Sequence, residues 1–247
     1  MDVKDSDITK NSCIIHLAAI TYVAYCEKYP KKCHDVNVIG TQKILEIARK
    51  KNCSMIYPST SHVYGIPKKL PIKETHPINA TSVYSESKIK AEQLCKKFSK
   101  SYDLDISILR LFSTYGPKNS EYKVESIIIK QLITKNLIKI GNLSPKRDFI
   151  YIDDVINAFQ IVSENLKGFN IYNVGSEKSY SIKEICNILK KLNGKKIRII
   201  TDKTKLRKND IKNVVSNCSR IKKLGWKSNV SINEGLELTL NWYITKK

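Results

Sequence analysis

The chain has 247 residues, the size of one large domain or two small ones, and its 41% hydrophobic content is enough for a substantial core. No apolar run approaches the ~20 residues that span a bilayer, and the opening stretch MDVKDSDITK contains no apolar signal region. We therefore expect a cytoplasmic protein without a membrane partner.

The formal charge of +21 would suit an anionic partner, but its distribution does not indicate a nucleic-acid surface. Only six of the 44 basic residues are arginines, and the lysines are spread along every segment. We expect solvated helix faces and no nucleic-acid partner, with a modest attraction for phosphate-bearing small molecules. The seven cysteines never form C-x-x-C, so they are interpreted as reduced core thiols, with no metal site.

The first half of the chain alternates short apolar runs with helical patterns. Strands are predicted at 12–19, 53–59 and 105–112, and helices at 37–51 and 82–102. The proline-containing stretch between them, 65–81, is predicted to be a loop. This alternation predicts an α/β fold, built on a parallel sheet with crossover helices.

After Pro117 the pattern becomes mixed and more irregular. A helix is predicted at 123–135, a strand followed by a helix within 147–164, and further strands at 169–175 and 195–200. Two capping-box signals, Ser181 with Glu184 and Ser231 with Glu234, mark the starts of two more helices.

One Tyr-x-x-x-Lys pair, Tyr84 and Lys88, lies in a strong helical context, where positions i and i+4 share a face. The other two such pairs contain Gly and Pro or lie at the C-terminal end. Thr60 follows the buried strand CSMIYPS. An exposed helical Tyr and Lys without function is the alternative interpretation, and Thr60 and the flanking segments weigh against it.

These three residues suit proton transfer from a sugar hydroxyl coupled to hydride transfer to a nicotinamide. A tyrosine with a pKa near ~10 is a poor base at neutral pH. A lysine ammonium one turn away favours the phenolate, so we expect Lys88 to lower the pKa of Tyr84. The hydroxyl of Thr60 can share the substrate proton and hold the sugar in line.

Seven further segments occur in a characteristic order and spacing. They are Asp2-Val3, HLAA at 16–19, NVIGT at 37–41, STSHVYG at 59–65, RLFSTYGP at 110–117, RDFIYIDDV at 147–155 and LGW at 224–226. Together with the Tyr-x-x-x-Lys pair they resemble the extended short-chain dehydrogenase/reductase family, the nucleotide-sugar epimerases and dehydratases. The resemblance runs from residue 2 to about 243.

The resemblance implies a Rossmann-like cofactor domain over 1–117, N-terminally truncated and with 148–175 contributing, and a smaller mixed α/β substrate domain over 118–247. It implies NAD as cofactor, with NADP as the alternative, and no metal. The implied partner is a nucleotide-diphosphate sugar, with a UDP-sugar first, and the implied assembly is a homodimer.

The resemblance also assigns roles to individual residues. Thr60 would be the proton-sharing hydroxyl, Tyr84 the base, and Lys88 the ribose clamp. The residues implied at the cofactor are Asp2, Val3, Leu17, Ala18, Ala19, Asn37, Tyr84 and Lys88. Those implied at the sugar nucleotide are Ser61, His62, Ser113, Arg147 and Arg207, with the two arginines at the diphosphate.

The sequence departs from the family pattern in four places, one of which is Lys118, where Arg is common after Gly-Pro. None of its nine glycines forms the GxxGxxG phosphate loop, so the family pattern begins about 60 residues late. A shortened gene product, a misassigned start codon, and real loss of the cofactor site are the three explanations. Ser113 stands where the family carries Asn. His62 stands where dehydratases and decarboxylases carry Glu, which argues against a dehydratase.

From this pattern we expect NAD-dependent 4-epimerisation of a UDP-hexose through a transient 4-keto sugar. A 4-keto-6-deoxy-sugar reductase and a UDP-sugar decarboxylase on the same fold are the nearest alternatives. A non-catalytic, truncated homologue that binds sugar nucleotides is an alternative from a different class.

Because no glycine-rich loop occurs in the sequence, we predict that this chain alone binds NAD weakly or not at all. Calorimetric titration of the protein with NAD measures this directly. A micromolar dissociation constant would contradict the prediction.

Overall fold

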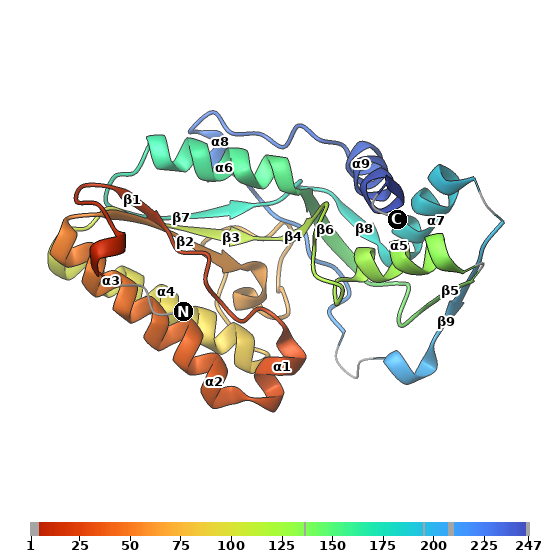
Figure 1. Cartoon of the computed structure of the whole chain (residues 1–247), viewed down its shortest axis with the longest axis horizontal. Helices are drawn as coiled ribbons and strands as arrows, with labels where there is room; N and C mark the ends of the chain where they lie inside the picture. Colours follow the sequence, from red (N-terminus) through yellow and green to blue (C-terminus); the bar gives the residue numbers. More distant parts are fainter. Residues whose placement is uncertain (1–4, 136, 195, 207–209, 246–247) are drawn as a thin grey trace.

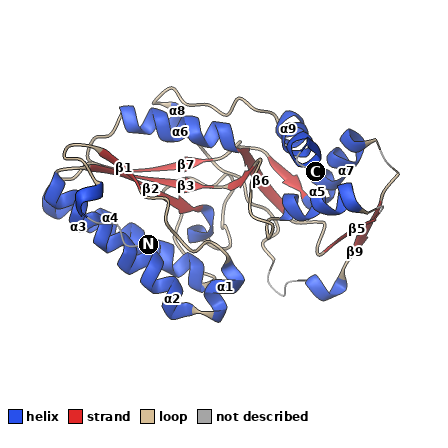
Figure 2. Cartoon of the chain, in the orientation of Figure 1, coloured by secondary structure: helices blue, strands red, loops and turns tan. Residues whose placement is uncertain are grey.

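The computed structural model describes residues 5–135, 137–194, 196–206 and 210–245, and it has a larger and a smaller lobe (Figures 1 and 2). Three residues with implied roles, Asp2, Val3 and Arg207, lie outside the described residues. No helix within the described ranges combines the length and the apolar character needed to cross a membrane.

The larger lobe is built on a four-stranded parallel sheet. Its strands are β1 (Cys13–Ile15), β2 (Ser54–Thr60), β3 (Ile106–Leu111) and β7 (Phe169–Val174), in that spatial order. Figure 1 shows α3 (Gly40–Lys51) and α4 (Val83–Tyr102) on one face and α6 (Ile152–Glu164) on the other. The predicted α/β fold with crossover helices is therefore confirmed.

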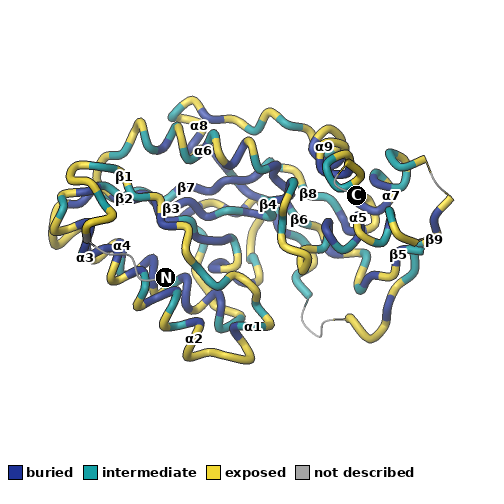
Figure 3. Tube along the Cα trace, in the orientation of Figure 1, coloured by how far each residue is buried: buried dark blue, intermediate teal, exposed yellow. Residues whose placement is uncertain are grey.

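Burial on both faces explains the nearly continuous apolar character of the strands. In β2, Met55 and Tyr57 pack with residues of α3 and α4, whereas Ile56 points the other way, into a cluster with Val155 and Ala158 of α6. In Figure 3, buried residues accordingly run along β2, β3 and β7 and alternate with exposed residues along the helices that cover the sheet. Six of the seven cysteines are buried, as expected, and Cys13 is exposed.

The smaller lobe has mixed architecture. It contains a three-stranded sheet of β4 (Ser113–Tyr115), β6 (Lys146–Tyr151) and β8 (Ser179–Ser181), and a parallel pair of β5 (Leu137–Ile140) and β9 (Arg198–Thr201). Its helices are α5 (Val124–Thr134), α7 (Ile182–Asn193) and α9 (Ile232–Thr245), which share one apolar core with β4 to β6. Short α8 (Ser219–Lys222) instead packs with α6 in the larger lobe. Three short 3-10 turns lie elsewhere, at η1 (Asp5–Asp7), η3 (Ser61–Tyr64) and η4 (Lys203–Lys205).

Most predicted elements are present, with informative differences near the N-terminus. The Ser181/Glu184 capping box forms, and Ser231 Oγ accepts the amide of Glu234. The first strand is shorter than predicted because the amide of Leu17 turns back to the carbonyl of Ile15 at 3.1 Å. The structure adds two helices that were not predicted, α1 (Val23–Lys28) and α2 (Pro30–His34), and the helix predicted at 37–51 begins with a π-helical turn, η2 (Asp35–Ile39), ahead of α3.

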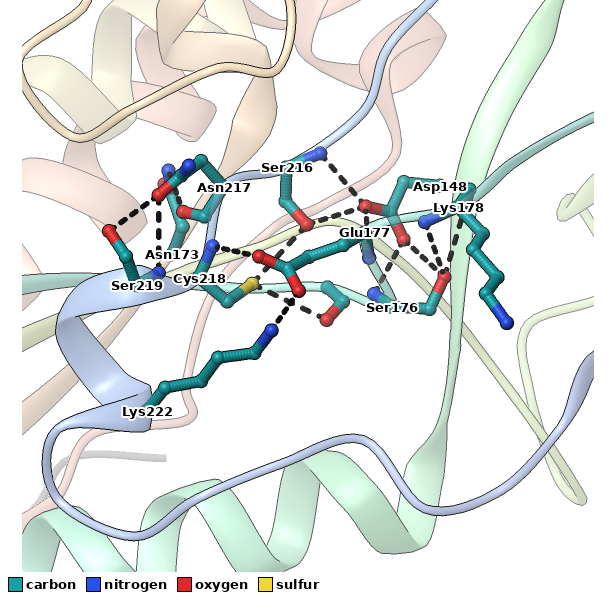
Figure 4. Close-up of polar contacts among 11 residues, drawn as sticks. Asp148, Asn173, Ser176, Glu177, Lys178, Ser216, Asn217, Cys218, Ser219 and Lys222 are labelled. Atoms are coloured by element: carbon teal, nitrogen blue, oxygen red, sulfur yellow. Dashed lines mark hydrogen bonds and ion pairs between the residues drawn. The ribbon is translucent and has the colours of Figure 1, made fainter.

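Asp148 on β6 is a buried junction between three segments of the chain (Figure 4). One carboxylate oxygen accepts the amide and hydroxyl of Ser176 at 2.6 and 2.8 Å, and the other accepts the amide and hydroxyl of Ser216 at 2.9 and 2.6 Å. The amide of Glu177 adds a fifth bond at 3.1 Å. A Cβ atom at neighbouring Gly175 would lie 2.7 Å from Asp148 Oδ2, so the close approach requires glycine.

A second acidic residue of the RDFIYIDD segment anchors the C-terminal part of the chain. The carboxylate of Asp154 accepts the Ser228 hydroxyl and the amides of Asn229 and Val230 at 3.0 to 3.1 Å. Its main-chain carbonyl accepts the indole of Trp226 at 3.0 Å. The conspicuous acidic motif is thus, at these two positions, a set of structural junctions.

Replacing Asp148 with alanine should strongly destabilise the fold. The change leaves five donors without their acceptor in a site that excludes water, and we expect a loss of about 3 kcal/mol or more in the free energy of unfolding. Urea unfolding followed by circular dichroism measures this. Asp35→Ala is the matched control, because that side chain is 56% exposed and should change stability by less than about 0.5 kcal/mol. Equal effects of the two changes would contradict the assignment.

Candidate active site

The first turns of α4 place Tyr84 and Lys88 against the sheet. A capping box starts the helix, because Ser82 Oγ accepts the amide of Ser85 at 3.1 Å and Ser85 Oγ accepts the amide of Ser82 at 3.0 Å. One turn apart on the inward face, Tyr84 is 7% exposed and Lys88 is 3% exposed. The pair is therefore part of the interior and not of the solvated helix surface.

Thr60 ends β2 at the carboxyl edge of the parallel sheet, where ligands usually bind in this class of fold. Its hydroxyl oxygen accepts the amide of His62 at 3.2 Å and so caps the short turn η3. The same hydroxyl lies near enough to the Tyr84 phenol to lower the pKa of that phenol. The structure thus brings together a hydroxyl and a phenol that lie 24 positions apart in the sequence.

Lys88 is a buried ammonium held over an aromatic face. Its Nζ lies 4.3 Å from the centroid of the Tyr57 ring, which is a cation–π contact. Burial lowers the pKa of Lys88 to about 8. His16, at the end of β1, is nearby, and burial together with the charge of Lys88 lowers the pKa of that imidazole to about 4. At neutral pH, His16 is therefore uncharged, and its Nε2 lies 3.2 Å from the hydroxyl of Thr41.

The expectation that Lys88 lowers the pKa of Tyr84 is not met in the protein by itself. Burial raises the pKa of Tyr84 to about 12, the nearby hydroxyl of Thr60 opposes this shift, and the buried thiols of Cys26 and Cys33 add to it. Lys88 is not among the groups that shift this pKa. The physical reason is that desolvation of the phenol dominates, while the ammonium lies over Tyr57.

Asn37 braces the segment that follows β1. Its Oδ1 accepts the amide of Ile20 at 2.7 Å, and its Nδ2 donates to the carbonyl of Ile20 at 2.9 Å and to Ser87 Oγ at 3.0 Å. The residue thus ties this segment to α4. The other residues implied at the cofactor are more open, since Leu17 is 69% exposed, Ala18 is exposed and Ala19 is half-buried. Their contact with a cofactor remains a prediction.

The residues implied at the sugar nucleotide fall into two groups. Ser61 is half-buried and His62 is exposed on η3, and the His62 ring stands edge-on to the Tyr84 ring with 6.0 Å between centroids. In the smaller lobe, Ser113 begins β4, half-buried. Arg147, on β6, pairs with Asp210 at 2.8 Å and donates to the carbonyl of Ile211 at 2.7 Å. Of these residues, His62 therefore lies beside the phenol, and the substrate roles remain predictions.

Sequence reasoning missed Glu92, which lies one turn beyond Lys88 on the same face of α4. Its carboxylate accepts Nε and Nη2 of Arg110 at 3.1 and 2.6 Å and the hydroxyl of Ser59 at 2.5 Å. Arg110 also donates to the phenol of Tyr64 at 3.1 Å. Burial disfavours the charged guanidinium, but its bonds to Glu92 outweigh this and raise the pKa of Arg110. The sequence did contain one indication of this role. Glu92 lies eight residues after Tyr84, about two helical turns, so it occupies the same helix face and points to the sheet.

Lys88→Met should change how stability depends on pH. The pKa of Lys88 is about 8 in the folded protein and about 10.5 in the unfolded chain, so the unfolded chain holds more protons between these values. Burial of the charged Lys88 ammonium lowers the free energy of unfolding by about 3 kcal/mol below pH 8, and this destabilisation is relieved as the pH rises toward 10.5. Lys88→Met should therefore be more stable than wild type at pH 7. Loss of the cation–π contact with Tyr57 reduces this gain, and the gain should shrink by pH 10.

Urea unfolding at pH 7, 8, 9 and 10 measures this difference. Lys90→Met is the matched control, because its ammonium is exposed and pairs with Glu86 at 2.8 Å on the helix surface. A difference between wild type and Lys88→Met that does not vary with pH would contradict the assignment.

Comparisons with known proteins agree with this architecture. A family model described as GDP-mannose 4,6 dehydratase matches residues 6–239. A UDP-glucuronate 4-epimerase of Thermodesulfobacterium geofontis is 34% identical over 236 residues, covering 94% of this chain and 72% of that protein. A UDP-glucose 4-epimerase of Mycolicibacterium smegmatis is 29% identical over 261 residues, covering 99% of this chain and 82% of that protein.

Solved structures share the fold over nearly the whole chain. RMD from Pseudomonas aeruginosa complexed with NADPH superposes with a TM-score of 0.90 at 25% identity, covering 95% of this chain and 82% of that one. UDP-glucose 4-epimerase from Thermotoga maritima with UDP-glucose gives a TM-score of 0.86 at 27% identity, covering 95% and 77%. The chain therefore belongs to the GDP-mannose 4,6 dehydratase family, within the NAD-dependent nucleotide-sugar epimerases and dehydratases of the extended short-chain dehydrogenase/reductase type.

Proposed function

We propose that this chain is an NAD-dependent nucleotide-sugar 4-epimerase acting on a UDP-hexose. The observation that carries the proposal is the placement of the Thr60 hydroxyl near the buried Tyr84 phenol, with buried Lys88 one helical turn further along α4. Relatives that are UDP-glucose and UDP-glucuronate 4-epimerases support a UDP-sugar substrate. The homodimer expected from the family remains a prediction.

The residues present fit one end of a nicotinamide dinucleotide. Lys88 is buried, and among the described residues the structure gives it no ion-pair partner, so its donors can serve uncharged hydroxyls such as those of a ribose. The opposite end needs a phosphate cradle, and no GxxGxxG segment occurs in the 247 residues. A bound NAD would supply the hydride acceptor for C4 of the sugar and the hydride source for the return step.

The chain's own residues would handle the proton. The substrate 4-hydroxyl would lie between Thr60 Oγ and the Tyr84 phenol, which accepts its proton as the hydride leaves C4. Because burial holds the pKa of Tyr84 at about 12, the phenolate requires positive charge brought close to the ring in the ligand-bound state. The 4-keto sugar then turns over in the site, and Tyr84 returns the same proton, so no net oxidation occurs.

A 4-keto-6-deoxy-sugar reductase is the second candidate, favoured by the similarity to a GDP-6-deoxy-D-mannose reductase of Pseudomonas aeruginosa and to RMD in complex with NADPH. The same Tyr84 would then give a proton to the C4 carbonyl oxygen, with the hydride entering C4 and no return step. Exchange of NADPH in each turnover distinguishes this reaction from epimerisation. A decarboxylase has less support, because His62 occupies the position where those enzymes carry Glu.

Tyr84→Phe should abolish epimerisation while sparing sugar-nucleotide binding. We expect interconversion of UDP-glucose and UDP-galactose, assayed by NMR with saturating NAD, to fall by about 10²- to 10⁴-fold because the base is lost. The dissociation constant for UDP-glucose, measured by calorimetry, should change by less than about threefold because the change removes one hydroxyl from a residue that remains packed.

Tyr102→Phe, in the last turn of the same helix and 47% exposed, should leave both measurements at the wild-type level. Undiminished turnover by Tyr84→Phe would exclude this residue as the base. Absence of turnover in wild type, together with intact binding of UDP-glucose, would favour the non-catalytic sugar-nucleotide-binding alternative.

A further inference from the structure

Two tyrosines from different lobes are stacked on each other at the surface. The rings of Tyr22 and Tyr122 have centroids 4.2 Å apart and planes inclined by 14°. The residues are 100 positions apart in the sequence, and the side chains remain largely in solvent, since Tyr22 is 44% exposed and Tyr122 is 65% exposed. A contact this distant in sequence and this accessible is not explained by the core of either lobe.

Tyr22 is fixed close to the candidate active site. It immediately precedes α1, and its carbonyl accepts the amide of Cys26 at 3.1 Å. The next residue, Val23, packs into a small apolar cluster that contains Tyr84. Two positions earlier, Ile20 is held through both its amide and its carbonyl by Asn37. The backbone of Tyr22 is therefore held by anchored neighbours on both sides, one of which packs into the cluster that contains Tyr84.

Tyr122 belongs to the connection between β4 and α5 in the smaller lobe. This connection leaves β4, which begins at Ser113, and its base is anchored by Asn119, whose Nδ2 donates to the carbonyl of Thr114 at 3.1 Å and to Glu125 at 2.6 Å. Its ring stacks on Tyr22, the residue that immediately precedes α1 in the larger lobe. The stacked pair thus bridges the lobes on the side where Thr60 and Tyr84 lie.

The strength of the contact suits reversible closure. A stacked aromatic pair shifts an equilibrium by a factor of about 2 to 13, equivalent to about 0.5–1.5 kcal/mol. Each lobe also has its own apolar core, so loss of the pair unfolds neither. A bridge of this strength is closed most of the time, yet it opens readily enough to let a ligand enter and leave.

We propose that Tyr22 and Tyr122 form a clasp that closes over a bound sugar nucleotide and slows its release. The inference rests on the proposed function, and both tyrosines act as positioning residues with no part in proton transfer. An epimerase needs such retention, because the 4-keto sugar has to turn over without leaving the protein. The clasp joins the wall next to Tyr84 to the lobe that carries Ser113 and Arg147.

The test is the dissociation rate of UDP-glucose, measured by surface plasmon resonance on the full chain. Tyr22→Ala and Tyr122→Ala should each raise the rate about 2- to 13-fold. The double variant should be no faster than the faster single variant, because either change alone breaks the stack. Tyr122→Phe keeps the ring and should dissociate at a rate within twofold of wild type.

Tyr29→Ala is the matched control. This side chain is 42% exposed in the same lobe and lies 4.8 Å from the Tyr25 ring, so its loss should leave the rate unchanged. Circular dichroism on heating checks that each variant is folded. Unchanged rates in both alanine variants, or effects that multiply in the double variant, would overturn the clasp and leave the proposed function standing. Failure of wild type to bind any UDP-sugar would overturn both.

Discussion

The buried ion pair between Glu92 and Arg110 determines how α4 sits on the sheet, and the site depends on that placement. The guanidinium comes from β3, the carboxylate from α4, and the same carboxylate accepts the hydroxyl of Ser59, the residue before Thr60 on β2. Removing one partner of such a pair typically costs 3–5 kcal/mol, because the other charge remains buried. The contacts of Glu92 thus hold α4 on β2 and β3 two helical turns from Tyr84. This placement positions the Tyr84 phenol near the Thr60 hydroxyl.

Burial determines the protonation states of the titratable side chains in the site. Burial keeps His16 neutral, holds the pKa of Lys88 near 8 and raises that of Tyr84 to about 12. In this state the phenol is a weak acid and Lys88 is a cation stabilised by an aromatic face. In the proposed epimerase, desolvation leaves the Tyr84 phenol protonated at neutral pH, so formation of the phenolate would depend on positive charge and hydroxyl groups supplied by the bound ligands.

Elements with strong hydrophobic periodicity or capping residues could be predicted from the sequence. So could the site residues that share one helix face or lie at a strand end. The helix with Tyr84 and Lys88 and the strand end at Thr60 are examples. The pKa of Tyr84 was not predictable, because desolvation depends on packing from the unpredicted helices α1 and α2. The Glu92–Arg110 pair and the Tyr22–Tyr122 stack were missed because the two partners of each lie far apart in the sequence, where no local sequence pattern predicts the contact.

The open side of β1 has a practical consequence for handling the protein. Among the described strands, β1 forms one edge of the sheet, and exposed Cys13, Ile15 and Leu17 lie on or next to it. Such an edge is a template for pairing between copies, which here repel one another through a formal charge of +21. Concentrated salt shortens the range of that repulsion from about 10 Å at 0.1 M to about 3 Å at 1 M. Colloidal stability should therefore fall with ionic strength, and contact between two edges would bring Cys13 thiols together for oxidative cross-linking in air.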